Sequence, residues 1–411
     1  MAWSAGTVSN LGDGVRYVAF PLLAAGLTRD PRAVTAVAAA GYLPWLLFGL
    51  LGGAVVDRVD RRRLMWRTDL LRAIAVAGFT ALVAAERAPV VAIAVMSFGL
   101  GAAQTLFDNA DSAMLPMLVP ASALDRANSL LVSSQTVMST LVGAPLGGLL
   151  YQFAPALPMA ADAVTFGLGA LLILAIPGSF SARREPAGTS VWQEIGTGLH
   201  WLWQDRVLRT LTLLLGLTGL TFAAAEAVLV LYALEVLDTG TMGYTGLLVA
   251  FAVGGLIGAL VAPRLRRRLG LPVLIVSASL GQAAGIVAVG LSSNLPVAVA
   301  ALVLVGFCNL AWTVTAISER QRRAPAELLG RVTSAYRVVG SAAQPFGAIL
   351  GGLAASSLGL HAPYLIGGVL LVGVTLACAP YLRQPTDLSP PTDLGEPADL
   401  GPPTALGDPA G

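Results

Sequence analysis

Lysine is absent from this chain, and charged residues of any kind are scarce. All 25 basic residues are arginine, and charged residues make up 12% of the 411 positions, about half of the roughly 25% that ordinary soluble domains carry. Without lysine the chain can form neither a P-loop for ATP hydrolysis nor a Schiff base. Hydrophobic residues reach 56% and the mean hydropathy is +0.76, which excludes a soluble globular fold.

Histidine and cysteine are equally rare, with two of each. His200 and His361 lie far apart in the sequence, and no HExxH pattern is present, so a zinc site of that kind is excluded. Cys308 and Cys378 lie inside apolar runs without CxxC spacing, which indicates small core residues rather than disulfides. We therefore expect no metal and no cofactor, and a protein that is not an enzyme.

Long apolar runs dominate what remains, and about 20 such residues suffice for one helical membrane span. Very short connections, such as Glu86–Pro89 and Ser293–Leu295, force neighbouring spans to be antiparallel. The pattern predicts an all-α membrane protein with twelve transmembrane helices. The expected spans are Ser4–Leu27, Ala33–Val56, Leu64–Ala85, Val90–Asn109, Ala127–Phe153, Ala156–Pro177, Leu208–Leu237, Gly243–Ala262, Leu271–Ser292, Pro296–Ser318, Val332–Leu358 and Ala362–Leu382.

The arginines are distributed unevenly between the two sides. With twelve spans, most of them fall in the loops on the side of both termini, whereas the opposite loops hold only Arg29, Arg32 and Arg87. Loops rich in Lys and Arg stay in the cytoplasm. We expect a multi-pass protein of the cell membrane with both termini cytoplasmic.

The two halves of the chain resemble each other. VPASALDRANS (Val119–Ser129) matches APAELLGRVTS (Ala324–Ser334), and Leu50–Arg63 matches Leu256–Leu269. Such a half-length repeat is typical of transporters built from two six-helix bundles related by a pseudo-two-fold axis. It predicts bundles over residues 1–178 and 208–382.

Two segments fall outside these bundles. The cytoplasmic central loop, 179–207, contains Val191–Leu208, whose apolar stripe and tryptophans predict an amphipathic helix on the inner membrane face; a linker helix without lipid contact is the alternative. Residues 383–411 repeat a Pro- and Asp-containing hexad. Because proline at each hexad start prevents helix formation, this tail is predicted to be disordered.

The loop after the second span carries an ordered set of charges. The segment GGAVVDRVDRRRLM follows the pattern G-x-x-x-D-R-x-x-R-R, and with the twelve spans and the repeat it resembles the major facilitator superfamily over residues 1–382. The matching residues are Gly53, Asp57, Arg58, Arg61 and Arg62.

Further segments narrow this resemblance. SNLGDGVRYVAFPLL on the first span, ALDRANSL before the fifth and WLWQDRVLRTL before the seventh are similar to the enterobactin-exporter and macrolide-efflux branch. The resemblance implies an exporter of small natural products that uses the proton gradient.

The chain departs from the family pattern in two places inside the spans and loops. On the fifth span, the segment GAPLGG places Pro145 one position later than the proline of the antiporter motif. We expect Gly143, Pro145, Gly147 and Gly148 to allow close helix packing. The second-half loop keeps its arginines but has Pro263 where the first has Asp57.

The charged loop is predicted to act as a cytoplasmic gate or latch. The eleventh span begins near Val332 at the same face, and the partial positive charge of its N-terminus attracts the Asp57 carboxylate. Arg58, Arg61 or Arg62 can pair with Asp108 or Asp111 at the end of span four. These charges lie at the membrane interface, so each ion pair is expected to stabilise the latch by about 1 kcal/mol.

Ionisable residues inside spans are costly and therefore candidates for function. Asp13 lies roughly 15 Å along the first span, and Arg16 at i+3 can pair with it, so this pair is either functional or structural. Glu226 is flanked by alanines with no basic residue within one turn, the setting of a carboxyl group that can carry a proton. Asp162 and Glu235 are expected nearer the outer face, in contact with water.

We therefore expect a secondary active transporter, an exporter of small amphipathic molecules coupled to protons, working by rocker-switch alternating access. An uptake permease of the same fold, or a non-transporting receptor or scaffold, are the alternatives. The expected partners are a small-molecule substrate, the proton and the lipid bilayer, with no nucleic acid, and the chain is expected to be monomeric. Aromatic residues expected to line the cavity are Tyr17, Phe20, Phe107, Trp312 and Tyr336.

Overall fold

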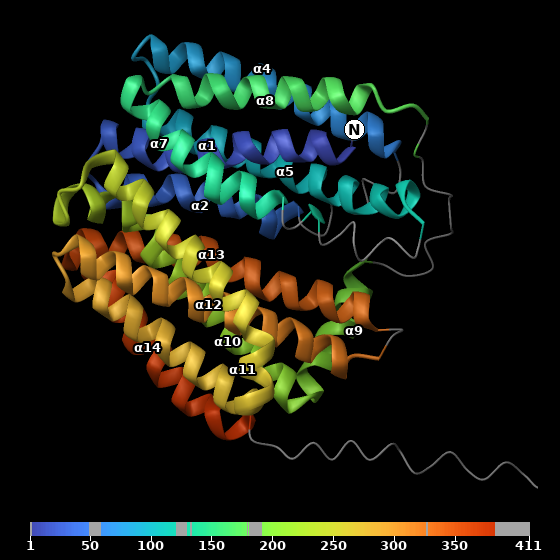
Figure 1. Cartoon of the computed structure of the whole chain (residues 1–411), viewed down its shortest axis with the longest axis vertical. Coiled ribbons are helices and arrows are strands. Elements are labelled where there is room, and N and C mark those ends of the chain that lie inside the picture. The colour runs from blue at the N-terminus through green and yellow to red at the C-terminus, as the bar shows by residue number, and fades with distance from the viewer. Residues whose placement is uncertain are drawn as a thin grey trace, which may run out of the picture.

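The structure is a computed structural model that describes residues 2–48, 59–120, 130–131, 134–178, 180, 191–325 and 328–382. All regular secondary structure within these residues is helical, and the helices form two bundles, one above the other in Figure 1. Seven of the described helices are long and apolar enough to cross a membrane. The expected all-α, two-bundle membrane fold is thereby confirmed.

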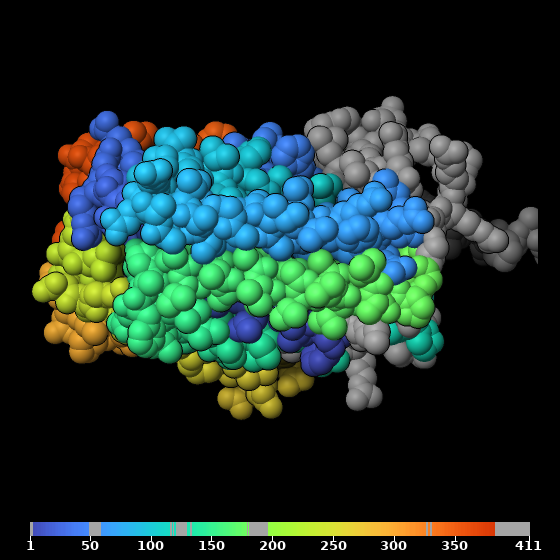
Figure 2. All heavy atoms as spheres, turned by 90° about the horizontal axis from the view of Figure 1, so that it is seen from above, coloured from blue at the N-terminus to red at the C-terminus, as the bar shows by residue number. Residues whose placement is uncertain are grey.

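The first bundle contains the helices from the N-terminal half of the chain. In Figure 2, two of them, α4 and α8, run side by side across the surface of this bundle that faces away from the second bundle. Its elements are α1 (Ala2–Leu27), α2 (Pro31–Phe48), α4 (Arg61–Ala84), α5 (Val90–Leu118), the π-helical η2 (Val137–Gly143) that continues into α7 (Ala144–Phe153), and α8 (Leu157–Leu174).

The second bundle contains the helices from the C-terminal half of the chain. Its elements are α9 (Val191–Gln204), α10 (Arg206–Leu231) continuing into η3 (Tyr232–Val236), α11 (Gly240–Leu291), α12 (Leu295–Arg323), α13 (Leu329–Leu358), α14 (Ala362–Cys378) and η4 (Ala379–Leu382). Helix α11 combines two expected spans, because the chain reverses at Gly270 with φ 75° and ψ 171°. Glycine adopts this backbone conformation without the steric penalty that a Cβ would bring.

Side-chain caps fix where several helices begin. The Asp60 carboxylate accepts the Arg63 N–H at the start of α4, and Asp205 accepts the Leu208 N–H at the start of α10. Each bond satisfies one of the N–H groups that a helix leaves without an internal partner. Asp60 and Asp205 therefore define where α4 and α10 begin.

Helix α9 is docked on the second bundle. Leu202 is fully buried in a core cluster with residues of α10, α12 and α13, and Gly198 lies against the α13 backbone at Arg331. Trp203 remains exposed. This helix thus packs one apolar face onto protein and presents Trp203 on its other side.

The bundles meet closely at one end of the molecule. Gly352 of α13 lies against Thr35 of α2, and Gly148 of α7 lies against Thr245 of α11. The exposed guanidinium of Arg32 donates to Ser356 Oγ across the same junction, at 2.9 Å. We call this the closed end; the other, which holds the Arg61–Arg63 and Arg264–Arg268 segments, is the arginine-rich end.

Candidate functional site

Glu226 joins the two bundles near the middle of the molecule. It lies on α10 of the second bundle, and its carboxylate accepts hydrogen bonds from the hydroxyls of Tyr17 on α1 and Tyr42 on α2. Both tyrosines belong to the first bundle. Any change in the charge or hydrogen bonding of Glu226 therefore acts directly on the contact between the bundles.

A mostly apolar pocket adjoins this carboxyl group. Phe222 and Phe251 pack with ring centroids 5.2 Å apart on one wall, and Glu226 is the one acid among the lining residues. The lining comprises Tyr17, Phe222, Ala225, Glu226, Leu229, Leu248, Phe251, Ile286, Val289, Leu302, Val305 and Tyr364. Such a mostly apolar pocket with one charged group is typical of sites for amphipathic small molecules.

Only one of the five aromatic residues expected in the cavity lines it. Tyr17 does so, whereas Phe20, Phe107, Trp312 and Tyr336 are buried in the bundle cores. They pack against other buried side chains instead; the Phe20 ring, for example, packs on the ring of Phe79. Hydropathy does not reveal which face of a span turns inward, and so Phe222, Phe251 and Tyr42 were not predicted.

Arg16 is shared by two carboxylates inside the first bundle. Its Nη2 lies 2.5 Å from Asp13 Oδ1, and its Nε lies 3.2 Å from Asp162 Oδ2 on α8. The pairing of Asp13 with Arg16 was predicted. The expectation that Asp162 contacts water is wrong, because it is fully buried where α8 packs on α1.

A second buried pair lies beside this group. Arg72 Nη1 is 3.3 Å from Asp69 Oδ1, and the guanidinium stacks over Phe107 and Phe166 at 5.3 and 5.1 Å. Glu235, by contrast, is partly exposed at the closed end and lies 3.6 Å from Arg29, in agreement with its expected position.

A polar cavity lies between the bundles toward the arginine-rich end. The first bundle contributes Asp108 of α5, which accepts a hydrogen bond from Gln104 at 2.7 Å. The second contributes Arg337 of α13, which is exposed and about 12 Å along its helix. The complete lining is Trp45, Asp108, Asn109, Ser112, Ser334, Arg337, Val338 and Ser341.

Part of the predicted latch lies outside the described residues, namely Gly53, Asp57 and Arg58. Of the rest, Arg61 donates to the Ala113 carbonyl of α5 at 3.1 Å. Arg62 donates to the carbonyl groups of Ile173, at 3.2 Å, and Leu174 at the C-terminal end of α8, and to that of Gly178 beyond it, at 3.0 Å.

These contacts differ from the carboxylate partners expected for Arg62. A guanidinium is favoured at a helix C-terminus because the carbonyl groups there carry partial negative charge. Arg62 thus anchors α4 to α8 within its own bundle. Asp111, the other expected partner, lies one turn beyond Asp108 on α5 and is half-buried. The role of the latch stays a prediction.

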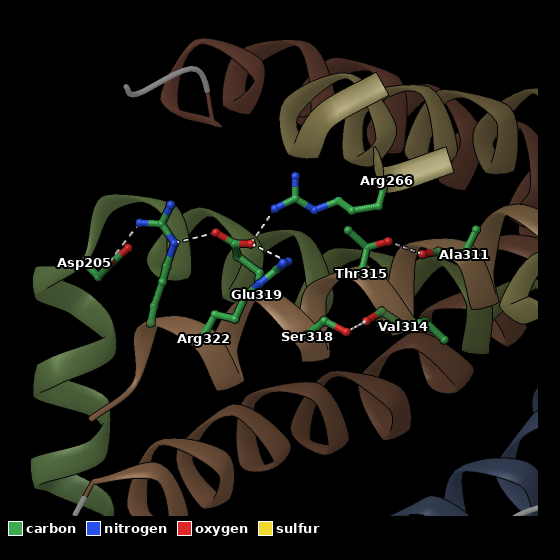
Figure 3. Close-up of polar contacts among 9 residues, drawn as sticks. Asp205, Arg266, Ala311, Val314, Thr315, Ser318, Glu319 and Arg322 are labelled. Carbon is green, nitrogen blue, oxygen red and sulfur yellow. Dashed lines mark hydrogen bonds and ion pairs between the residues drawn. The ribbon is translucent and has the colours of Figure 1, made fainter. Parts of the chain in front are cut away.

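The second bundle has a carboxylate hub at its arginine-rich end, shown in Figure 3. The buried Glu319 of α12 accepts from Arg266 of α11 at 2.7 Å, from Arg322 at 3.1 Å and from Arg323 at 2.7 Å. Arg323 also reaches Asp205, 3.4 Å away, where α9 meets α10.

The arginine-rich segment of α11 has Pro263 where the first half of the chain has Asp57, and Glu319 provides the carboxylate partner for Arg266 of this segment. It was missed because it comes from another helix than the repeat predicts. The charge pattern Glu319-Arg320-x-Arg322-Arg323 at the end of a span was the available signal.

The glycines of the GAPLGG segment lie at two different helix contacts. Gly143 and Gly147 lie against the α1 backbone at Leu11 and Val15, within the first bundle. Gly148 lies against Thr245 of the second. Pro145 lies at the start of α7, directly after the π-helical turn of η2.

Two helical bundles with a cavity between them are the arrangement found in membrane transporters built from repeated halves. Residues 1–393 match the family model described as transmembrane secretion effector. The chain belongs to this family of major facilitator transporters, and it is an efflux transporter of that type.

Curated relatives cover nearly the whole chain. The multidrug efflux pump Tap of Mycolicibacterium fortuitum is 29% identical over 92% of this chain and 95% of its own length. Tap of Mycobacterium tuberculosis H37Rv is 30% identical over 92% of each. Macrolide efflux protein A of Streptococcus pyogenes is 24% identical over 92% of this chain and 94% of its own.

Solved structures show the same fold at low identity. The nucleoside transporter NupG superposes with a TM-score of 0.72 at 10% identity, covering 93% of this chain and all of NupG. A bacterial homologue of the lysosomal transporter Spinster, inward-facing and occupied, gives 0.71 at 12% identity over 93% of this chain and 94% of its own.

Proposed function

We propose that this transporter exports small amphipathic molecules that carry a positive charge, in exchange for protons, with Glu226 as the proton carrier. The observation that carries the proposal is the position of Glu226: it is the one acid in an apolar cavity, and it bridges the bundles through Tyr17 and Tyr42. The names of the relatives, which mention multidrug and macrolide efflux, support the substrate class.

The orientation follows from charge. The arginine-rich end is cytoplasmic by the positive-inside rule, which places both termini in the cytoplasm. The closed end then faces outward, and the polar cavity opens inward. In the proposed cycle, this arrangement is the state that collects substrate from the cytoplasm.

Neutralising Glu226 changes the contact between the bundles. As a carboxylate it accepts hydrogen bonds from both tyrosine hydroxyls, which favours the arrangement with the outer end closed. A proton occupies one of its acceptor sites and turns the group into a donor, and a cationic substrate competes with the hydroxyls for the same oxygens. Because substrate and proton act on one carboxyl group, they are bound alternately and their fluxes are coupled.

Closing the cytoplasmic side requires the polar cavity to lose its water. Arg337 and Asp108 line opposite walls, and a charge buried without a partner is costly. We expect them to pair when α5 and α13 approach, with Asp57 acting beside them at the start of α13. Ion pairs at such partly hydrated sites contribute little individually, which suits a step that reverses in every cycle.

The test is proton movement in proteoliposomes that contain a pH-sensitive dye. Ethidium, a fluorescent lipophilic cation, and a macrolide serve as probes. The wild type should move protons against each probe, and Glu226→Gln should retain probe exchange at equal concentrations while losing coupling to the pH gradient.

Two further variants sharpen this test. Asp13→Asn examines the other carboxyl candidate, and Glu235→Gln is the matched control because Glu235 is partly exposed at the closed end, away from the cavity. The proposal fails if Glu226→Gln remains fully coupled, or if the wild type moves no protons with any transported probe.

A further inference from the structure

The interior of the first bundle holds more acid than base. Asp13 and Asp162 share Arg16, and Asp69 pairs with Arg72. In the described part of the bundle this gives three carboxyl groups and two guanidinium groups, and Asp108 adds acid near Arg72. An unbalanced charge in the interior of a membrane protein is costly.

The charges that face Asp162 come from the helices packed against α8. Helix α1 contributes Asp13 and Arg16, and α4 contributes Asp69 and Arg72. Helix α7 contributes no charged residue, and the hydroxyl of its Tyr151 donates to the Leu22 carbonyl. Asp162 therefore has one guanidinium in direct contact, which it shares with Asp13.

Asp162 is the least well satisfied of the three acids. It is fully buried, and neither oxygen accepts a hydrogen bond within the described residues. Arg16 directs its Nη2 to Asp13 at 2.5 Å, while its Nε stands 3.2 Å from Asp162 without hydrogen-bond geometry. A buried carboxylate of this kind would be far less stable than a neutral carboxyl group.

The contact between α1 and α8 depends on the absence of a side chain at Gly12. A Cβ at this position would meet the Asp162 carboxyl group and Thr165. The glycine thus lets Asp162 lie directly against α1, beside Arg16. The close packing of α1 on α8 thus holds the Asp162 carboxyl group next to Arg16.

From this charge balance and packing, we infer that Asp162 is a second proton-binding site, carrying the proton that neutralises the Asp13–Arg16–Asp162 triad. The proton leaves when Arg16 turns from Asp13 to Asp162. Asp13 and Arg16 are partly exposed, so they give the proton a route to water. In the transport cycle this inference rests on the proposed function: one proton binds at Glu226 and a second at Asp162 for each substrate exported.

Difference infrared spectroscopy of the purified transporter in lipid nanodiscs detects a protonated carboxyl group directly. At neutral pH the wild type should show a band to which Asp162 contributes, and Asp162→Asn should lose that contribution. Asp13→Asn should lose it too, because removing one acid frees Arg16 to pair with an ionised Asp162. Glu235→Gln is the control and should retain the band. Asp162→Glu, which should shift the band, replaces the asparagine variant if that variant does not fold.

Proton counting in the dye-loaded proteoliposomes gives the transport readout. Protons moved per ethidium should fall from two to one in Asp162→Asn. A protonated-carboxyl band that persists unchanged in Asp162→Asn overturns the inference, as does a proton count that stays at two per ethidium in this variant. If the wild type moves no protons although Asp162→Asn loses the band, the proposed coupling fails while the proton site stands.

Discussion

The closed end should open when a methyl group is added at either of two glycines. A Cβ at Gly148 would lie 3.1 Å from Thr245 Cβ, and one at Gly352 would lie 3.0 Å from Thr35 Cβ. Neither threonine can readily turn away, because each hydroxyl donates to the carbonyl four residues earlier, at 2.9 and 2.8 Å. Both contacts join the two bundles, so Gly148→Ala and Gly352→Ala strain the closed outer end specifically.

The size of the effect follows from the cost of overpacking. Inserting a methyl group into a tight contact costs about 1–3 kcal/mol, and this cost disappears once the bundles separate at that end. The equilibrium should therefore move toward the outward-open state by roughly 5- to 150-fold per substitution. The gain in helix propensity from glycine to alanine, about 1 kcal/mol, applies to both states and cancels.

Spin labels on cysteines at Thr28 and Leu358 report the opening. These positions lie on different bundles at the closed end, and replacing Cys308 and Cys378 with alanine leaves only the introduced cysteines. The pulsed-resonance distance distribution should shift to longer distances in both variants, and substrate flux should fall.

Two other glycines serve as controls for this experiment. Gly78 and Gly373 have open space where a Cβ would be added, so Gly78→Ala and Gly373→Ala should leave the distances unchanged. Wild-type distance distributions in well-folded Gly148→Ala and Gly352→Ala would show that these contacts do not hold the outer end closed.

Three further changes test other parts of the molecule. Glu319→Gln should lower the free energy of unfolding by about 3 kcal/mol, because three arginines lose a buried carboxylate partner; thermal unfolding in detergent measures this, and an unchanged melting temperature would contradict it. Asp108→Arg should block flux by placing two positive charges across the polar cavity, and Asp108→Arg combined with Arg337→Asp should restore part of it; equal flux in the single and double variants would remove the pair from the gate. Truncation after Arg383 should leave membrane insertion and flux intact, and loss of flux in correctly inserted protein would assign the hexad repeat a role.

The sequence alone determined the fold class and the kind of protein. Twelve apolar segments, short connections and a half-length repeat are local or nearly local features, so they can be read without knowing any contact. The identity of Glu226 as an unusual carboxyl group also came from the sequence, because its neighbours along α10 are apolar. The pairing of Asp13 with Arg16 followed from helical spacing alone.

The arrangement of the side chains around these features was decided by the tertiary structure. Tyr17 and Tyr42 are 209 and 184 residues from Glu226, and no periodicity links such positions. Asp162 was placed near water by its depth along the span, yet the rotation of α8 turned it toward Arg16. In lipid, outward- and inward-facing residues are both apolar, so hydropathy gives the length of a span but not its buried face. Only the packing of helices against one another selects that face, and with it the partners of every buried charge.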